Sequence, residues 1–174
     1  MSGGEPTIYP DFCVAVFQKM RQAGIHTALE TCGYCQEGDL RRIAPYTDLF
    51  LYDLKAVSEA AHVQWTGADN VRIKDNLSML IQSGHRVVVR IPLIPGFNDG
   101  VEFVEMMRYL VTLEGVSEVH ILPFHQVGAA KYEQAGAVYG MEQVNECLPE
   151  LAEHQAEVAR SYGFAVNIGG WDCR

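Results

Sequence analysis

The sequence predicts an α/β fold built around a parallel sheet. Short apolar runs alternate along the chain with amphipathic stretches, and glycine, proline or asparagine marks many of the boundaries between them. The run at 86–93, RVVVRIPL, is rich in β-branched residues and is the clearest strand. Strands that alternate with helices are typical of βαβ units. No repeat or linker interrupts the pattern, so residues 1–174 are expected to form one domain.

The boundaries of the elements follow from local signals. In the first helix, Phe12, Val16 and Phe17 have helical spacing, with Pro10 before and Gly24 after. A later helix is expected to begin at Asn70, as its N-cap. The expected helices are 11–23, 39–44, 70–81, 99–112 and 141–162, the last bent at Pro149; the expected strands are 25–30, 49–54, 86–93, 119–124 and 164–168.

Composition and charge narrow the class of function. Of the 174 residues, 48% are hydrophobic and 20% charged, as in ordinary globular proteins. A net charge of −9 disfavours nucleic acids and anionic membranes as partners. No apolar run reaches the roughly 20 residues that a transmembrane helix needs, and the first residues do not resemble a signal peptide. Five irregularly spaced cysteines do not form a disulfide framework, which favours the cytoplasm.

Polar residues follow the apolar runs and should meet at one edge of the sheet, because ligands bind beyond the carboxyl ends of parallel strands. Gly3 and Gly4 allow a backbone to approach a ligand closely, and Glu5 offers an acceptor for an ammonium group. The alternative is a plain turn, with Glu5 as a charge in the first turn of a helix. Arg90, in the apolar strand at 86–93, reaches the same edge.

Two further strand ends offer candidate binding residues. Asp53 and Lys55 are two residues apart, so they share a face if both lie in a strand. They could pair with each other, or Lys55 could hold a carboxylate or a hydroxyl group. His125 follows Pro123 and could donate to a bound group or stack on it. The alternatives are a solvated ion pair and a structural histidine.

Cys32 and Cys35 form a Cys-x-x-Cys pair, which is the spacing of a redox dithiol or of half a zinc site. A zinc site would need a second pair, and the sequence has none. A coincidental spacing is favoured over a thiol-redox enzyme.

Taken in order, six blocks resemble the glycyl-radical enzyme activating enzymes of the radical S-adenosylmethionine superfamily, of which pyruvate formate-lyase activating enzyme is the best-known member. The resemblance runs from Ser2 to about Gly169 and is closer to the branch serving hydroxyphenylacetate, glycerol or choline-type lyases. The blocks are SGGEP (2–6), LETCGY (29–34), LFLYDLKA (49–56), WTGADN (65–70), RIPLIPGFND (90–99) and ILPFHQVG (121–128).

The resemblance implies a partial (β/α)6 TIM-like barrel that binds S-adenosylmethionine at the carboxyl ends of its strands. It implies that Gly3, Gly4 and Glu5 meet the methionine amino end. Asp53, Leu54 and Lys55 match a second contact segment, and His125 matches a histidine on the adenosyl side. Glu30 stands where relatives often have aspartate, near the amino-acid carboxylate or an adjacent cation.

The family's reaction also needs a [4Fe–4S] cluster on a Cys-x₃-Cys-x₂-Cys loop, and this sequence has no such motif. A 5′-deoxyadenosyl radical then takes hydrogen from a glycine of a partner lyase, with flavodoxin or ferredoxin as electron donor. The opening turn has almost no strand before it, so the expectation is a C-terminal portion that lacks the first strand and the cluster loop and is inactive alone. The alternative is a non-catalytic module that docks a lyase or an N-terminal half.

Overall fold

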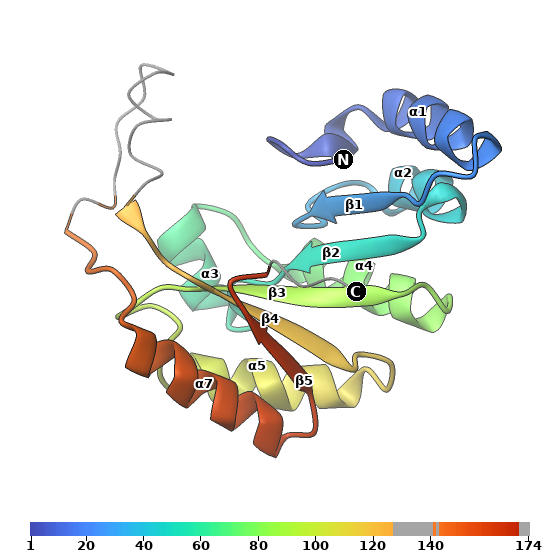
Figure 1. Ribbon diagram of the computed structural model, residues 1–174. Helices are drawn as coiled ribbons and strands as arrows, with labels where there is room; N and C mark the ends of the chain where they lie inside the picture. Colours follow the sequence, from blue (N-terminus) through green and yellow to red (C-terminus); the bar gives the residue numbers. More distant parts are fainter. Residues whose placement is uncertain (127–140, 142, 171–174) are drawn as a thin grey trace.

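The computed structural model describes residues 1–126, 141 and 143–170. In this part of the chain, strands and helices alternate almost regularly (Figure 1). The strands are β1 (Ala28–Thr31), β2 (Leu49–Asp53), β3 (Val87–Leu93), β4 (Glu118–Pro123) and β5 (Ala165–Ile168). The helices are α1 (Pro10–Gln22), α2 (Glu37–Ile43), α3 (Glu59–Thr66), α4 (Val71–Gln82), α5 (Val101–Thr112) and α7 (Pro149–Ser161), with short 3₁₀ turns η1 (Pro6–Ile8) and η2 (Ala44–Tyr46).

The five strands form one parallel sheet in the order β1-β2-β3-β4-β5. Each strand therefore lies beside its neighbour in sequence, and every carboxyl end points to the same edge. The curved sheet with helices along its outer side is the partial barrel that the resemblance implied (Figure 1).

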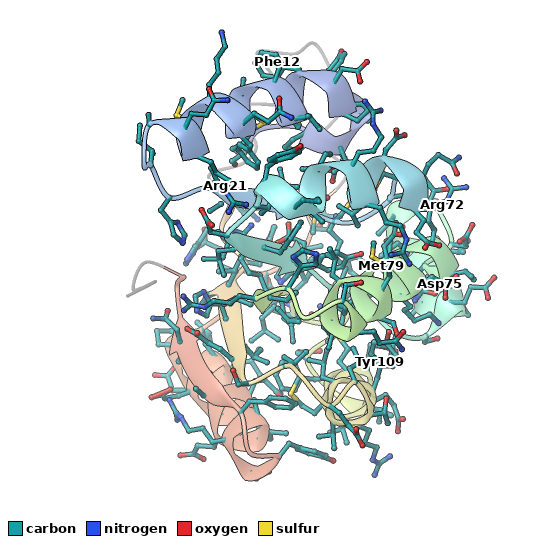
Figure 2. All side chains as sticks on the ribbon, turned by 90° about the vertical axis from the view of Figure 1, so that its right-hand side faces the viewer. Phe12, Arg21, Arg72, Asp75, Met79 and Tyr109 are labelled. Carbon is teal, nitrogen blue, oxygen red and sulfur yellow. The ribbon has the colours of Figure 1, made fainter. Side chains whose placement is uncertain are left out.

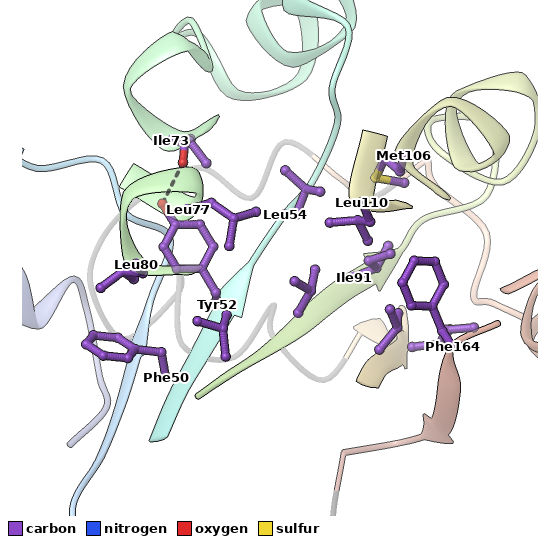
Figure 3. Packing of buried hydrophobic residues seen from close by; sticks show 14 of the residues in the cluster. Phe50, Tyr52, Leu54, Ile73, Leu77, Leu80, Ile91, Met106, Leu110 and Phe164 are labelled. Carbon is purple, nitrogen blue, oxygen red and sulfur yellow. Dashed lines mark hydrogen bonds between the residues drawn. The ribbon is translucent and has the colours of Figure 1, made fainter. Parts of the chain in front are cut away.

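The core lies between one face of the sheet and the outer helices. Phe50, Tyr52 and Ile91 are fully buried and point toward the helices. The residues between them in the strands point to the other face, which is called the inner face below. Leu77 of α4 and Met106 of α5 belong to the same cluster (Figure 3). The hydroxyl of Tyr52 donates to the carbonyl of Ile73, 2.6 Å away, so this buried phenol has a partner. The inner face carries charged side chains such as Asp53 and Arg90 together with apolar ones such as Val88.

Most predicted elements are confirmed, but one prediction is wrong and one helix was missed. Helix α7 begins at Pro149, whereas a bent helix from Met141 was predicted; Leu148 is extended, because a residue before proline avoids the helical region. Helix α3, capped by Ser58, was not predicted. Asn70 occupies the N-cap position of α4, but its side chain makes no capping bond.

Some sequence features lie outside the described residues. They are Val127 and Gly128 of the last block, residue 142 of the predicted helix, and Cys173. None of the helices among the described residues is long and apolar enough to cross a membrane.

Candidate functional site at the carboxyl ends of the strands

Three charged side chains meet on the inner face of the sheet. Glu30 lies on β1, Asp53 at the end of β2 and Arg90 in the middle of β3, directly opposite Asp53 in the strand register. The guanidinium of Arg90 donates from Nε to Asp53 Oδ1 at 2.8 Å and from a terminal nitrogen to Glu30. One cation thus links two carboxylates across three adjacent strands.

Burial and the guanidinium of Arg90 act in opposite directions on the pKa values of the two carboxyl groups. Burial raises the pKa of Asp53, and Arg90 offsets this only in part. Burial also opposes ionisation of Glu30, but hydrogen bonds from Ser2 and Arg90 outweigh it, so its pKa is lowered. The pKa of Arg90 is raised, because its two carboxylates outweigh its burial. The group thus contains two acidic side chains and one basic side chain, and Lys55 lines the same recess as Asp53.

The Gly-Gly-Glu turn is anchored to the end of β1 through Glu5. One carboxylate oxygen accepts from the hydroxyls of Thr7 (2.6 Å) and Thr31 (2.7 Å), and the other accepts from the backbone N–H of Cys32 at 2.9 Å. These bonds outweigh the burial of Glu5 and hold its pKa below the ordinary value. Both oxygens are engaged by the protein, so the exposed parts of the turn are Gly3 and Gly4, with φ of 95° and 59°.

Lys55 is placed differently from the pairing considered in the sequence. Strand β2 ends at Asp53, so Lys55 lies in the loop beyond it, and Asp53 pairs with Arg90 instead. The ammonium of Lys55 makes no hydrogen bond or ion pair with any described residue. Lys55 and Asp53 both line a recess of about 170 Å³, together with Cys32 and Tyr34 from the loop after β1.

The remaining predicted residues are less closely joined to this group. The side chain of Leu54 is fully buried in the core, so only its backbone can face the edge; its N–H donates to the carbonyl of Arg90 at 2.9 Å. His125 is exposed just beyond β4 and makes no hydrogen bond or ion pair within the described residues. It shares the edge of the sheet with the others, but no contact in the described chain joins it to them.

The geometry disfavours a redox pair at Cys32 and Cys35. Both are free thiols, and burial raises the pKa of each, to about 11 for Cys32, whose thiol also donates to Glu5. A reactive cysteine needs a lowered pKa. Across the described residues, no group of three or more His, Cys, Asp or Glu side chains could hold a metal ion.

The sequence placed Arg90 at this edge but did not predict a binding role for it, although it is the centre of the charged group. The available signal was a charge within an otherwise apolar strand, which requires a buried partner. His120 was also missed. It lies beside Arg90 in the register and is fully buried, with Nε2 2.8 Å from Glu118. The ring of His120 therefore lies next to Arg90 on the same face of the sheet, on strand β4.

Comparisons with known proteins identify the family and the fold. The family model described as Radical SAM superfamily matches residues 1–110. The chain belongs to the radical SAM superfamily. A domain of pyruvate-formate lyase-activating enzyme from Bacteroides vulgatus superposes with a TM-score of 0.81 at 23% identity, covering 98% of this chain and 97% of that one, and so shares the fold.

Curated relatives of this radical SAM chain are named as activating enzymes, which confirms the predicted resemblance. Choline trimethylamine-lyase activating enzyme of Oleidesulfovibrio alaskensis is 35% identical over 97% of this chain and 56% of its own length. Trans-4-hydroxy-L-proline dehydratase activating enzyme of Clostridioides difficile is 34% identical over 98% and 57%. The chain thus spans a little over half the length of the curated relatives it matches.

Membership of the superfamily implies S-adenosylmethionine and a [4Fe–4S] cluster as cofactors, and the described residues fit the first group only. The uncommitted ammonium of Lys55 and the two carboxylates of the inner face suit a ligand that carries both a carboxylate and positive charges. The described cysteines do not suit a cluster, because three of the four are buried and no three of them stand in the Cys-x₃-Cys-x₂-Cys spacing that a cluster loop needs.

Proposed function

We propose that this chain is the S-adenosylmethionine-binding part of an activating enzyme that forms a glycyl radical on a partner lyase. In this proposal the chain, which has no Cys-x₃-Cys-x₂-Cys motif, is inactive by itself. The ligand sits at the carboxyl ends of β1 to β4, within a single domain. S-adenosylmethionine, bound beside a reduced cluster, supplies an adenosyl radical. The residues of this chain bind and orient it.

The observation that carries the proposal is the free ammonium of Lys55. It stands beside Asp53 in the recess, yet Asp53 is already bound to Arg90. A lysine that lines a cleft without a carboxylate partner is available for a ligand carboxylate. In the proposal Lys55 holds the carboxylate of the methionine moiety.

The other predicted residues take positions consistent with that placement. The exposed backbone of Gly3 and Gly4 is proposed to meet the amino end, and Glu5 holds this turn against β1. Glu30 and Asp53 supply the negative field for an ammonium group or an adjacent cation. The backbone at Leu54 completes the contact segment, and His125 is proposed to contact the adenosyl side.

Calorimetric titration of the 174-residue chain with S-adenosylmethionine tests the proposal. We expect weak but measurable binding, and about a tenfold loss in Lys55→Ala, because a charge-assisted hydrogen bond contributes about 1.5–3 kcal/mol. Lys19→Ala on the exposed side of α1 is the matched control and should bind as the wild type does. Absence of binding to the wild-type chain, or equal affinity of Lys55→Ala and Lys19→Ala, would contradict the proposal.

A thiol–disulfide assay separates this proposal from a redox enzyme. We expect Cys35→Ala to leave any such activity of the chain unchanged, because burial raises the pKa of both thiols. A large loss in that variant would support redox chemistry instead.

A further inference from the structure

The loop that carries Lys55 is held by side chains from three other segments. The carbonyl of Lys55 accepts from Nδ2 of Asn98 at 2.9 Å, in the loop after β3. The carbonyls of Ala56 and Val57 accept from Nδ2 of Asn70 at 2.9 and 3.0 Å, just before α4. The next two backbone N–H groups, of Val57 and Ser58, donate to one oxygen of Glu102 on α5, at 2.6 and 3.0 Å.

Asn98 contacts the segments at the carboxyl ends of two strands, β2 and β3. Its Nδ2 also donates to the carbonyl of Pro92 at 2.8 Å, while its Oδ1 accepts from the N–H of Ile94 at 2.8 Å. The side chain is fully buried and uses three bonds to backbone groups. It therefore ties the loop after β2 to the loop after β3. Asn70 is equally buried, and its Oδ1 has no partner among the described residues.

This tight backbone contrasts with the uncommitted side chain that it carries. A lysine side chain has four flexible bonds and loses about 1.5–2 kcal/mol of conformational entropy when it is ordered. Ordering the backbone is a separate cost, and fixing the Cα of Lys55 before a ligand arrives removes that cost from binding and limits where the ammonium can reach. The need to hydrogen-bond buried backbone groups does not by itself explain why this loop carries a lysine whose ammonium has no partner among the described residues.

We propose that Asn98 and Asn70 are positioning residues that fix the backbone of Lys55 so that its ammonium faces the ligand. The inference rests on the proposed function, because it takes Lys55 as the ligand-binding cation. Neither asparagine touches the ligand itself. The two act through the carbonyls of Lys55, Ala56 and Val57.

The first test needs no ligand. Trypsin cleaves after lysine, and cleavage of the bond between Lys55 and Ala56 reports local opening of this loop. We expect Asn98→Ala to increase the rate of this cleavage about tenfold, and Asn70→Ala to increase it as well. Should Asn98→Ala fail to fold, Asn70→Ala decides the test.

Asn76→Ala is the matched control. Asn76 is buried, and its Nδ2 likewise donates to two carbonyls, of Gly33 at 2.8 Å and Cys35 at 3.0 Å, in the loop after β1. It should lose similar global stability without a selective increase in cleavage after Lys55. Equal cleavage rates in the Asn98→Ala, Asn70→Ala and Asn76→Ala proteins would overturn the inference.

A double-mutant cycle of S-adenosylmethionine affinity provides the second test. We expect Asn98→Ala to weaken binding about threefold in the wild-type background and to have no further effect once Lys55 is alanine. Independent losses in both backgrounds would show a role that does not pass through Lys55. If the wild-type chain binds no S-adenosylmethionine, the proposed function fails, while the cleavage rates still decide whether the asparagines hold the loop.

Discussion

The exits of β1, β2 and β3, meaning the segments that follow the carboxyl ends of these strands, differ from the exit of β4 in the side chains that they carry, although all four lie at one edge of the sheet. At the first three, Glu5, Arg90 and Asn98 each join two or more segments through hydrogen bonds. At the fourth, His125 is exposed and has no partner among the described residues. The backbone there is joined to β3 by a bond from Phe124 N–H to the carbonyl of Leu93, and to the segment before α7 by a bond from Cys147 N–H to the carbonyl of Phe124, both at 3.0 Å.

The difference follows the charge that each part is proposed to meet. A carboxylate and an ammonium group lose strong hydration on binding, so they need partners that are already in place. An adenosyl group is bound largely through its flat apolar faces and needs less prior order. The contrast predicts that changes to the joining side chains at the first three exits affect both folding and binding, and that removal of the His125 side chain affects binding alone.

The largest effect is expected at Gly33, in the loop after β1. Its φ is 72°, and a Cβ there would lie 1.6 Å from the hydroxyl oxygen of Tyr52. Gly33→Ala should therefore lower the free energy of unfolding by about 3 kcal/mol, measured by urea denaturation. Gly84, with φ of 76° and nothing within 4 Å of a built Cβ, is the matched control. Gly84→Ala should cost about 1 kcal/mol, and equal losses would refute the close packing at this exit.

Arg90→Met should have the second-largest effect. It leaves Glu30 and Asp53 without their shared cation, and we expect a loss of about 2–3 kcal/mol, because the three side chains are only partly exposed. The loss should shrink at low pH, where the two carboxylates are protonated. Arg108→Met, at the exposed pair with Glu105, is the control and should change much less. A loss independent of pH would contradict the electrostatic explanation.

Glu5→Gln should change the pH dependence of stability. The folded-state pKa of Glu5 lies below its ordinary value of 4.5, so the unfolded chain binds this proton more readily. The stabilisation is complete above about pH 4.5 and is lost as the pH falls through the folded-state value. Glu5→Gln should cost on the order of 1 kcal/mol at pH 7 and flatten the acid limb of the curve. Glu157→Gln, on the exposed side of α7, should leave the curve unchanged; an unchanged curve for Glu5→Gln would contradict the assignment.

The smallest effect is expected at the fourth exit. His125→Ala should leave the melting temperature unchanged, because the side chain has no partner in the described chain. It should weaken S-adenosylmethionine binding about threefold, as measured by calorimetry, since one contact on the adenosyl side is lost. A loss of stability, or a loss of affinity as large as that of Lys55→Ala, would remove the distinction between the two parts of the edge.

The sequence predicted the fold and the edge of the sheet where the candidate residues lie better than the contacts among those residues. Apolar runs and their polar ends placed Glu30, Asp53 and Lys55 at one edge, because parallel strands must end together. Spacing alone could not predict that Asp53 binds Arg90 and not Lys55, since that depends on where β2 ends and on the register with β3. The roles of Asn70 and Asn98 depend on contacts across 13 to 43 residues, which no local pattern encodes.

Backbone NMR mapping with S-adenosylmethionine tests the central claim most directly, since it shows which residues surround the ligand. If the strand ends form one site, the amide signals of Gly4, Lys55 and His125 will shift together and saturate with one dissociation constant, while that of Gly84 stays unchanged. Another recess is the groove between α4 and α5, lined by Asp75 and Tyr109 (Figure 2). Shifts confined to that groove, or different dissociation constants for the three signals, would contradict the claim.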